Sequence, residues 1–242
     1  YLEIYFQFVG YSLKYKPVQD GIQGEVAVSL EIRSGDSLVR SDAYLLQSPV
    51  IKDSIVDDFF DLRRYALSPG QYSLKITLKD MVANGKEINA AQPLILEELG
   101  EGISFSDIEV IEYGKKGGEG SPFYKSGYYM LPRLSSYYPE ELESLPVYLE
   151  LYQSNTLGDS LCGLKQTITN METGVELTDL TVYNKIRTEE VVPIMRNVDI
   201  TQVPSGKFAL TYTLISRSMK ELCSQTYLFE RTNDQEVSWT PE

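Results

Sequence analysis

Two stretches of the chain share one plan, in which a glycine turn precedes a long strand with a single apolar face. In residues 67–80, Pro69-Gly70 predicts a turn, and apolar and polar residues then alternate up to Asp80. In residues 203–215, Gly206 takes the same place. A period of two is typical of a strand that buries one face. The repeat predicts two copies of one β module, with buried faces formed by Tyr72, Leu74, Ile76 and Leu78 and by Phe208, Leu210, Tyr212 and Leu214.

The rest of the chain supports a duplicated β fold. The opening Tyr1-Leu-Glu-Ile-Tyr5 is echoed by Tyr148-Leu-Glu-Leu-Tyr152, and short alternating segments are separated by turn signals roughly every 8 to 12 residues. We therefore predict an all-β chain of two tandem immunoglobulin-like antiparallel β-sandwiches. Glycines at 100 and 102 indicate the boundary between domains 1–100 and 101–242. The second domain is expected to contain a Tyr/Pro-rich irregular insertion at about 114–146.

One segment, residues 53–66, fits two patterns. A helical stripe would place Ile55, Val56, Phe59 and Phe60 on one face. A strand would instead place Val56, Asp58, Phe60 and Leu62 on one face, with one charge directed inward. We expect a short strand or a turn of helix here, leading into Pro69.

Composition excludes several classes of function. Hydrophobic residues make up 42% of the chain, and no apolar run approaches the roughly 18 residues of a membrane helix. The formal net charge of -13 repels phosphate backbones, so we expect no nucleic-acid partner. The chain contains no histidine, which excludes triad hydrolases and His-containing zinc sites. We predict no metal and no cofactor.

The two cysteines, Cys162 and Cys223, both lie in the second domain. They could form one disulfide if their strands are neighbours, or remain as two buried free thiols. The chain begins at Tyr1 inside a predicted strand, without an initiator Met, a signal peptide or a lipidation motif. This start is typical of a trimmed mature segment.

The turn before the first repeated strand resembles a tyrosine corner. In this device, a Tyr near the start of a strand donates a hydrogen bond back to the preceding turn. Leu67-x-Pro69-Gly70-x-Tyr72 has the required spacing, so we assign a structural role to Pro69, Gly70 and Tyr72. In the second copy, Gly206 and Phe208 keep the turn and the ring, but the ring has no hydroxyl.

Acidic residues cluster in two places. The first cluster could bind calcium, but it lacks the spacing of an EF-hand loop, so a solvated acidic loop is the simpler interpretation. Paired carboxylates for glycoside cleavage are conceivable in either place, although acidic residues are common throughout the chain. The first cluster contains Asp53, Asp57, Asp58 and Asp61, and the second contains Glu140, Glu141 and Glu143.

Aromatic residues are concentrated in the predicted insertion, where proline interrupts regular structure. Such side chains can form an exposed platform that stacks on sugars or anchors a protein partner. They could instead fill the interface between the two domains. The candidate binding residues are Tyr124, Tyr128, Tyr129, Arg133, Tyr137 and Tyr138.

Four short motifs resemble the tandem immunoglobulin-like region of Bacteroidota envelope proteins of the GWxTD-domain group. They are Tyr1-Leu-Glu-Ile-Tyr5, Leu67-Ser-Pro-Gly-Gln-Tyr72 continuing to Lys79-Asp80, Ser106-Asp-Ile-Glu109, and Tyr148-Leu-Glu-Leu-Tyr152. The GWxTD signature itself is absent, since the single Trp is Trp239 in Ser-Trp-Thr-Pro. The resemblance implies export to the periplasm or cell surface and a non-catalytic module. It carries over no functional residues.

Together these observations predict a non-enzymatic binding or scaffolding segment of an exported bacterial envelope protein, with an unknown protein or glycan as partner. A carbohydrate-binding accessory module that uses the tyrosine platform is the main alternative. An enzyme that relies on carboxylates alone is a third hypothesis, and it would need two carboxylates facing each other in a cleft.

Overall fold

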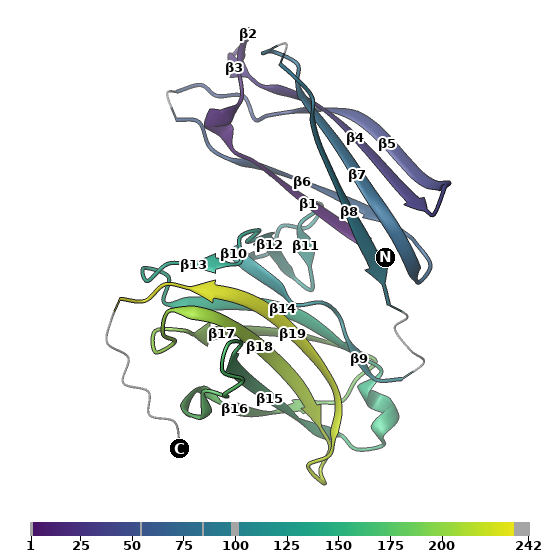
Figure 1. Ribbon diagram of the computed structural model, residues 1–242, viewed down its shortest axis with the longest axis vertical. Helices are drawn as coiled ribbons and strands as arrows, with labels where there is room; N and C mark the ends of the chain where they lie inside the picture. The colour runs from purple at the N-terminus through teal and green to yellow at the C-terminus, as the bar shows by residue number, and fades with distance from the viewer. Residues whose placement is uncertain (1, 54, 84, 98–101, 235–242) are drawn as a thin grey trace. The chain divides into compact units, whose positions relative to one another are not determined.

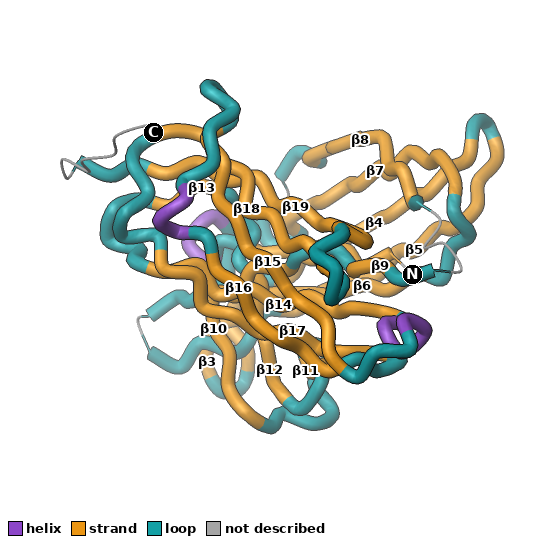
Figure 2. Tube along the Cα trace, turned by 90° about the horizontal axis from the view of Figure 1, so that it is seen from below, coloured by secondary structure: helices purple, strands orange, loops and turns teal. Residues whose placement is uncertain are grey.

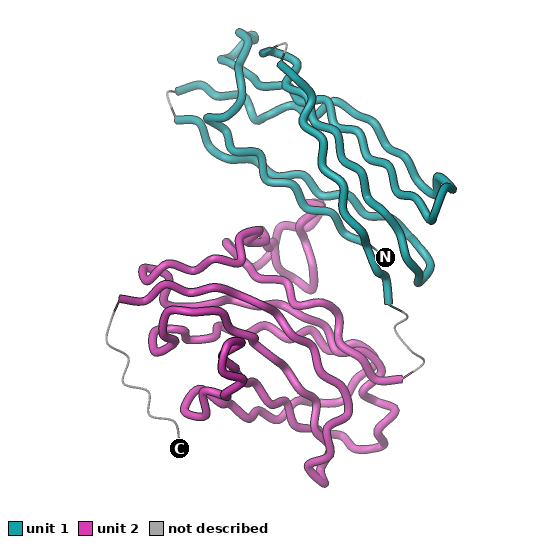
Figure 3. The backbone as a smooth tube through the Cα atoms, viewed as in Figure 1, with its two compact units in different colours: residues 1–98 teal, residues 99–242 magenta. Residues whose placement is uncertain are grey.

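The computed structural model describes residues 2–53, 55–83, 85–97 and 102–234. Nineteen strands and three short 3-10 helices make up the regular structure of these residues, so the chain is all-β (Figure 2). It divides into two compact units, residues 1–98 and 99–242 (Figure 3). None of the helices in the described residues has the length and apolar character needed to cross a membrane.

Unit 1 is a sandwich of a four-stranded and a two-stranded antiparallel sheet (Figure 1). One core lies between the sheets, because each contributes apolar residues from alternate positions. The larger sheet has the order β5 (Ser37–Gln47), β4 (Glu25–Ser34), β7 (Gly70–Asp80), β8 (Ile88–Leu96), and the smaller pairs β1 (Leu2–Phe8) with β6 (Phe59–Tyr65). The 3-10 helix η1 (Gly10–Ser12) and a separate hairpin of β2 (Lys16–Val18) and β3 (Gly21–Gln23) lie between β1 and β4 in the sequence.

Unit 2 is a larger sandwich with the same central arrangement. Its first sheet has the order β11 (Tyr124–Lys125), β12 (Tyr128–Pro132), β10 (Glu109–Lys116), β14 (Ser144–Tyr152), β17 (Val191–Asp199), and β9 (Ser104–Phe105) also pairs with β14. Its second sheet has the order β13 (Tyr137–Tyr138), β19 (Glu221–Arg231), β18 (Gly206–Ile215), β15 (Leu161–Asn170), β16 (Val182–Arg187). The 3-10 helices are η2 (Ser154–Leu157) and η3 (Thr178–Leu180).

The duplication holds strand by strand. The order β5-β4-β7-β8 in unit 1 corresponds to β16-β15-β18-β19 in unit 2, and the pair β1-β6 corresponds to β14-β17. The register also agrees, because Gly70 at the start of β7 faces Leu96, as Gly206 at the start of β18 faces Arg231. Both units are therefore immunoglobulin-like sandwiches built on one six-strand plan.

Both central strands begin at a glycine with positive φ, +154° at Gly70 and +147° at Gly206. The ring two residues later packs over each glycine. A Cβ atom would lie 3.6 Å from the Tyr72 ring in the first copy and 3.4 Å from the Phe208 ring in the second. The Tyr72 hydroxyl donates to the carbonyl oxygen of Ser68 at 2.8 Å, which is the bond expected of a tyrosine corner.

The ambiguous segment forms a strand, β6, but it faces the opposite way from the strand pattern predicted above. Phe59 pairs with Phe8 across the small sheet, and their rings stack at 5.0 Å. This register places Asp61 on the inner face and Phe60 on the outer face. Two charged residues, Asp61 and Arg63, therefore point inward, where the prediction had one.

Those inward charges belong to a polar seam between β5 and β6. The Tyr44 hydroxyl donates to Asp61 Oδ2 at 2.5 Å, and Arg63 Nε lies 3.0 Å from the same oxygen. The Arg63 guanidinium also lies 3.5 Å from the centre of the Tyr44 ring. Burial, followed by the bond to Asp61, raises the pKa of Tyr44. The seam thus satisfies polar groups that the sandwich would otherwise bury unpaired.

The segment at about 114–146, expected to be irregular, contains the end of β10, the short strands β11, β12 and β13, and the start of β14, with loops between them. Cys162 on β15 and Cys223 on β19 are free thiols. Since β18 lies between their strands, two spacings of about 4.8 Å separate the backbones. A disulfide spans at most about 7 Å between Cα atoms, so of the two alternatives the structure has the free thiols.

We predict that Tyr72→Phe lowers the free energy of unfolding of unit 1 by about 1 kcal/mol, because it removes the hydrogen bond to Ser68. Denaturant unfolding of the full chain measures the change. Tyr11→Phe, at an exposed position, is the matched control and should leave the transition in place. Equal midpoints for Tyr72→Phe and wild type would show that the corner bond adds no stability.

The pH dependence of unit 1 follows from Tyr65, whose hydroxyl donates to Asp42 at 3.0 Å. Burial, followed by this bond, raises the pKa of Tyr65 from 10.0 to about 12. The folded state holds the proton more tightly than the unfolded chain, so this stabilisation is complete below about pH 10 and is lost as the pH rises towards 12. We expect the stability of unit 1 to fall across that range, and to fall less steeply in Tyr65→Phe. Denaturant unfolding at several pH values measures both slopes, and identical slopes would contradict the assignment.

Candidate functional site

The predicted aromatic segment forms a three-stranded sheet that extends the first sheet of unit 2. β12 lies in the middle and pairs with β10 on one side and β11 on the other. Glycines close the connection between β10 and β11. Gly118 has φ of +98°, and a Cβ atom there would lie 2.7 Å from the Cβ of Tyr129, so the loop approaches β12 too closely for any other residue.

One face of this extension presents aromatic rings and a cation. Lys115 pairs with Tyr129, Tyr129 pairs with Tyr124, and Tyr113 lies two residues before Lys115, so all four share a face. We call Tyr113, Lys115, Tyr124 and Tyr129 the tyrosine surface. The Tyr113 and Tyr129 rings meet edge to face at 6.4 Å, and Lys115 Nζ lies 5.6 Å from the centre of the Tyr129 ring. Tyr113 is 51% exposed, and its ring is open to a ligand.

Two contacts hold Tyr129 in place. Its ring packs edge to face on buried Phe123 at 6.1 Å, and the loop at Gly118 lies against its Cβ. Burial, followed by the nearby Tyr113, raises the pKa of Tyr129. The ring therefore stays neutral at physiological pH and has little freedom to move. A rigid aromatic side chain loses little entropy when it binds a ligand.

The opposite face of the extension is buried against β14. Ile111, Met130 and Tyr148 form a small apolar cluster there, with Tyr128 packed against it. The Tyr148 hydroxyl lies 2.9 Å from Ser126 Oγ and also donates to Glu150. Burial, followed by the bond to Glu150, raises the pKa of Tyr148. Tyr128 therefore contributes to packing of the extension and lies on the face away from the tyrosine surface.

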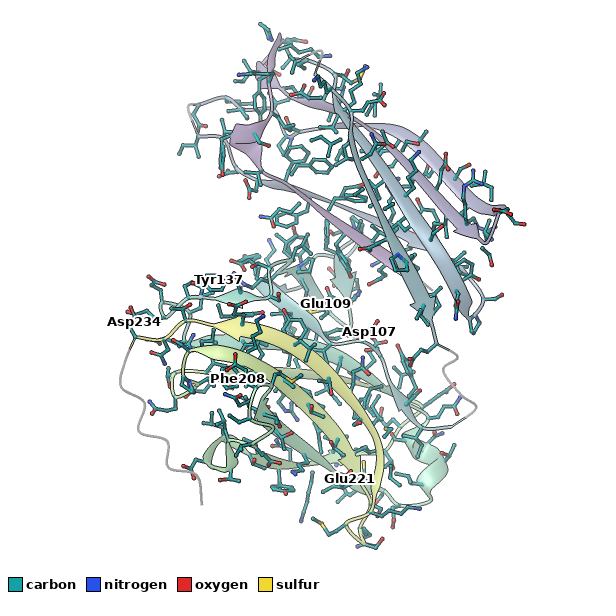
Figure 4. All side chains as sticks on the ribbon, viewed as in Figure 1. Asp107, Glu109, Tyr137, Phe208, Glu221 and Asp234 are labelled. Carbon is teal, nitrogen blue, oxygen red and sulfur yellow. The ribbon has the colours of Figure 1, made fainter. Side chains whose placement is uncertain are left out.

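Two carboxylates lie at the base of the extension, and both have structural partners. Glu109 on β10 forms an ion pair with Lys125 on β11 at 2.7 Å (Glu109 is labelled in Figure 4). Glu150 on β14 accepts a bond from the Tyr152 hydroxyl at 2.6 Å. Unit 1 repeats the second arrangement, because the Tyr5 hydroxyl donates to Glu3 at 2.5 Å. The two Tyr-Leu-Glu-x-Tyr motifs therefore form equivalent hydrogen bonds, each from the last Tyr to the Glu.

Three of the predicted site residues lie elsewhere, around β13. Tyr138 is 1% exposed and packs edge to face on Phe229 at 5.7 Å, so the prediction that it lines a surface was wrong. Tyr137 is 44% exposed, and its hydroxyl donates to Thr232 Oγ1 at 3.0 Å. Arg133 forms an ion pair with Glu112 at 2.5 Å and donates to the Tyr137 carbonyl at 3.0 Å. Its guanidinium stacks on the Tyr138 ring at 5.0 Å.

A buried arginine fixes β13 against the end of β19. Arg231 Nε donates to the carbonyl of Val203 at 3.1 Å, and one terminal nitrogen donates to the carbonyls of Pro139 and Leu142 at 3.2 and 2.8 Å. These bonds explain why a charged residue is found inside the sandwich. β13 and its two tyrosines are therefore part of the framework of unit 2.

The structure thus divides the predicted platform into three groups. Tyr124 and Tyr129 lie on the tyrosine surface, and Tyr128 lies on the opposite face of the extension. Arg133, Tyr137 and Tyr138 belong to the β13 framework. Tyr113 and Lys115 were not among the predicted candidate residues, because irregular structure was expected from about residue 114 onwards. The alternation of Tyr113 and Lys115 in an extended β10 was the signal that could have found them.

The acidic clusters do not form a cation site. Asp58 accepts bonds from the Gly10 N–H and the Gln7 side chain at 3.0 and 2.8 Å, and Asp61 belongs to the polar seam. Asp53 accepts from the Ile55 N–H at 3.4 Å, and Glu140 accepts from the Asp234 N–H at 3.1 Å. Within the described ranges, no group of three or more acidic or cysteine side chains is placed to hold a metal.

No family model matches the chain, and no curated protein does. Among solved structures it is similar to a tetra-tandem repeat in the extending region of a large adhesion protein, with 12% identity, TM-score 0.28, and coverage of 95% of this chain and 50% of that chain. It is also similar to a glycosyl hydrolase family 2 member from Bacteroides cellulosilyticus, with 8% identity, TM-score 0.31, and coverage of 94% and 28%. A third similarity is to β-glucuronidase 2 of Bacteroides uniformis, with 10% identity, TM-score 0.29, and coverage of 94% and 26%. The chain spans half or less of the length of these proteins, and likeness this low transfers no function to it.

Adjacent tyrosines in β13 give a matched test of these assignments. We expect Tyr138→Ala to lower the free energy of unfolding of unit 2 by about 3 to 5 kcal/mol, because it leaves a cavity beside Phe229. Tyr137→Ala removes an exposed ring and one surface bond, so its cost should stay below about 1 kcal/mol. Denaturant unfolding distinguishes the two, and equal losses would place Tyr138 outside the core.

Proposed function

We propose that the chain is a non-catalytic binding segment and that the tyrosine surface is the part that meets its ligand. The observation that carries the proposal is the exposed Tyr113 ring beside Tyr129, with Lys115 over the same face. Tyrosine is enriched at binding hot spots, because it offers a large apolar ring and a polar tip. Lysine next to the rings adds a cation for an acidic ligand group.

Absence of catalytic activity is part of this proposal. Its support is that several charged residues in and around the two sandwiches have structural partners. Asp61 and Arg63 join the seam of unit 1, Arg133 pairs with Glu112, and Arg231 caps three carbonyls. Side chains committed in this way are poorly suited to the proton transfers or nucleophilic attack of an enzyme.

We further propose that the parent protein is exported to the periplasm or cell surface, where the two sandwiches act as a binding or scaffolding segment. The support is the resemblance of the repeated Tyr-Leu-Glu-x-Tyr motif and of the Pro-Gly-x-Tyr motif at residues 69–72 to envelope proteins of the GWxTD-domain group. A surplus of acidic residues, 35 against 22 basic ones, favours solubility in such a setting.

A carbohydrate-binding accessory module is the second candidate. It is favoured by the geometry of the same surface, because the open face of a tyrosine ring can stack on the apolar face of a sugar. Lys115 on the same surface is exposed, and its ammonium group could donate hydrogen bonds to sugar hydroxyls. Both candidates use the same residues, so one set of variants tests both.

We expect the double variant Tyr113→Ala/Tyr129→Ala to lose its ligand while remaining folded. Loss of two hot-spot rings should weaken binding by at least about tenfold, since each 1.4 kcal/mol corresponds to a factor of ten. Quantitative pull-down from envelope extract identifies a protein ligand, and titration then measures affinity. Tyr183→Ala, an exposed tyrosine on β16, is the control and should bind as wild type does.

A glycan array with the same three proteins separates the two candidates. Binding of wild type and the control, but not of the double variant, would support the carbohydrate module. Binding to no glycan would exclude it. A ligand retained at full affinity by the double variant would overturn the tyrosine surface as the binding site.

A further inference from the structure

The edge strand β8 of unit 1 carries no charged side chain to protect its open edge. Edge strands commonly carry charged side chains that discourage pairing with another strand. The sequence of β8, INAAQPLIL, contains none, whereas β1, β5, β6, β16 and β17 each contain at least one. Ile88 and Ile95 are 68% and 70% exposed, and among the described residues β8 pairs with β7 alone.

The second copy of the module shows what can occupy this edge. β19 of unit 2 corresponds to β8, and β13 pairs with its outer edge in parallel, Tyr137 beside Glu230 and Tyr138 beside Arg231. The Glu230 N–H donates to the Ser136 carbonyl at 2.9 Å, and the Thr232 N–H donates to the Tyr138 carbonyl at 3.0 Å. A short strand with a core-facing aromatic ring thus completes unit 2 at this position.

The strand registers show which residues of β8 in unit 1 correspond to those of β19 in unit 2. Gly70 faces Leu96 as Gly206 faces Arg231, so Ile95 and Glu97 correspond to Glu230 and Thr232. Pro93 of β8 lies opposite Ser73 of β7. The two cannot form a hydrogen-bonded pair, because proline has no N–H. By alternation, the N–H groups of Ile95 and Glu97 therefore face the open edge, as their counterparts in unit 2 do.

Pro93 also limits where a strand can pair. It removes the donor two residues before Ile95, so a continuous ladder cannot run along the middle of β8. This disfavours side-by-side pairing of two β8 strands from separate copies. It leaves the end of β8, at Ile95 and Glu97, as the place for a short strand, which is where β13 pairs in unit 2.

The side-chain environment matches as well. In unit 2 the inward ring of Tyr138 packs on Phe229, which itself packs on Phe208 at 5.7 Å. Leu94 and Tyr72 hold the equivalent positions in unit 1, and both are only partly buried against the core. The surroundings of Leu94 and Tyr72 are apolar and therefore suit an apolar or aromatic side chain.

We propose that the end of β8 is a strand-acceptor site, whose ligand is a short extended peptide of the β13 type, parallel to β8, with an aromatic residue facing the core. Its main-chain carbonyls would accept from the Ile95 and Glu97 N–H groups. The site lies in unit 1 and uses no residue of the tyrosine surface, so it goes beyond the proposed function. Main-chain pairing would give affinity, and the aromatic position would give specificity.

A graft into the full chain tests this site. Tyr1 and Tyr148 occupy the same position of the repeat, so the graft is a copy of residues 134–147 placed directly before Tyr1. The copied Tyr138 then lies ten positions before Tyr1, as Tyr138 lies ten positions before Tyr148 in unit 2. Amide hydrogen exchange followed by NMR should slow at least about tenfold at Ile95 and Glu97. Ala91 faces the same edge on the other side of Pro93, and its exchange should not change.

A control graft carries Tyr→Asp at the copied Tyr138, since a carboxylate facing the core opposes docking. Its exchange at Ile95 and Glu97 should match that of the ungrafted chain. Equal exchange in all three proteins, with each one folded by near-UV circular dichroism, would overturn the proposal. Equal slowing by both grafts would also overturn it, because the aromatic residue would then have no part in recognition.

Discussion

The fold depends on how the central strand of each unit begins. Gly70 and Gly206 adopt a backbone conformation that favours glycine, and the ring two residues later covers each of them. This start fixes which residues of β7 and β18 face the core. Because side chains alternate along a strand, a slip of one residue would turn every apolar side chain towards solvent. The register then passes to the neighbouring strands, so the same start also decides which amides of β8 and β19 face the sheet edge.

The sequence was most informative where one face of a strand is apolar and the other polar. β7 and β18 follow this pattern, and their existence and facing were predicted correctly. β6 was assigned the wrong face, because two phenylalanines stand side by side and either could point inward. The choice is made by tertiary contacts, namely the ring of Phe8 and the hydroxyl of Tyr44. Neither partner is near β6 in the sequence, so local pattern could not reveal them.

The candidate site was predicted only in part, for a related reason. The tyrosines of β10 to β13 do not alternate cleanly, and glycine and proline interrupt them, so composition suggested irregular structure. Cross-strand pairing brings Tyr113 and Lys115 beside Tyr129 and sends Tyr128 to the opposite face. Tyr138 was assigned to a surface because nothing in its neighbourhood predicts the parallel pairing that buries it. Residue types indicated the right region, and long-range pairing decided which residues are available to a ligand.

The parallel pairing of β13 with β19 has a mechanical consequence. When two parallel strands are pulled from opposite ends, their hydrogen bonds are loaded in shear and resist together, whereas a hairpin opens one bond at a time. Arg231 adds bonds to Pro139 and Leu142 just beyond β13, which reinforces the same junction. Resistance to pulling is set by the rate of unfolding and can differ from equilibrium stability. Under tension along the chain, this junction would act as a shear clamp for unit 2.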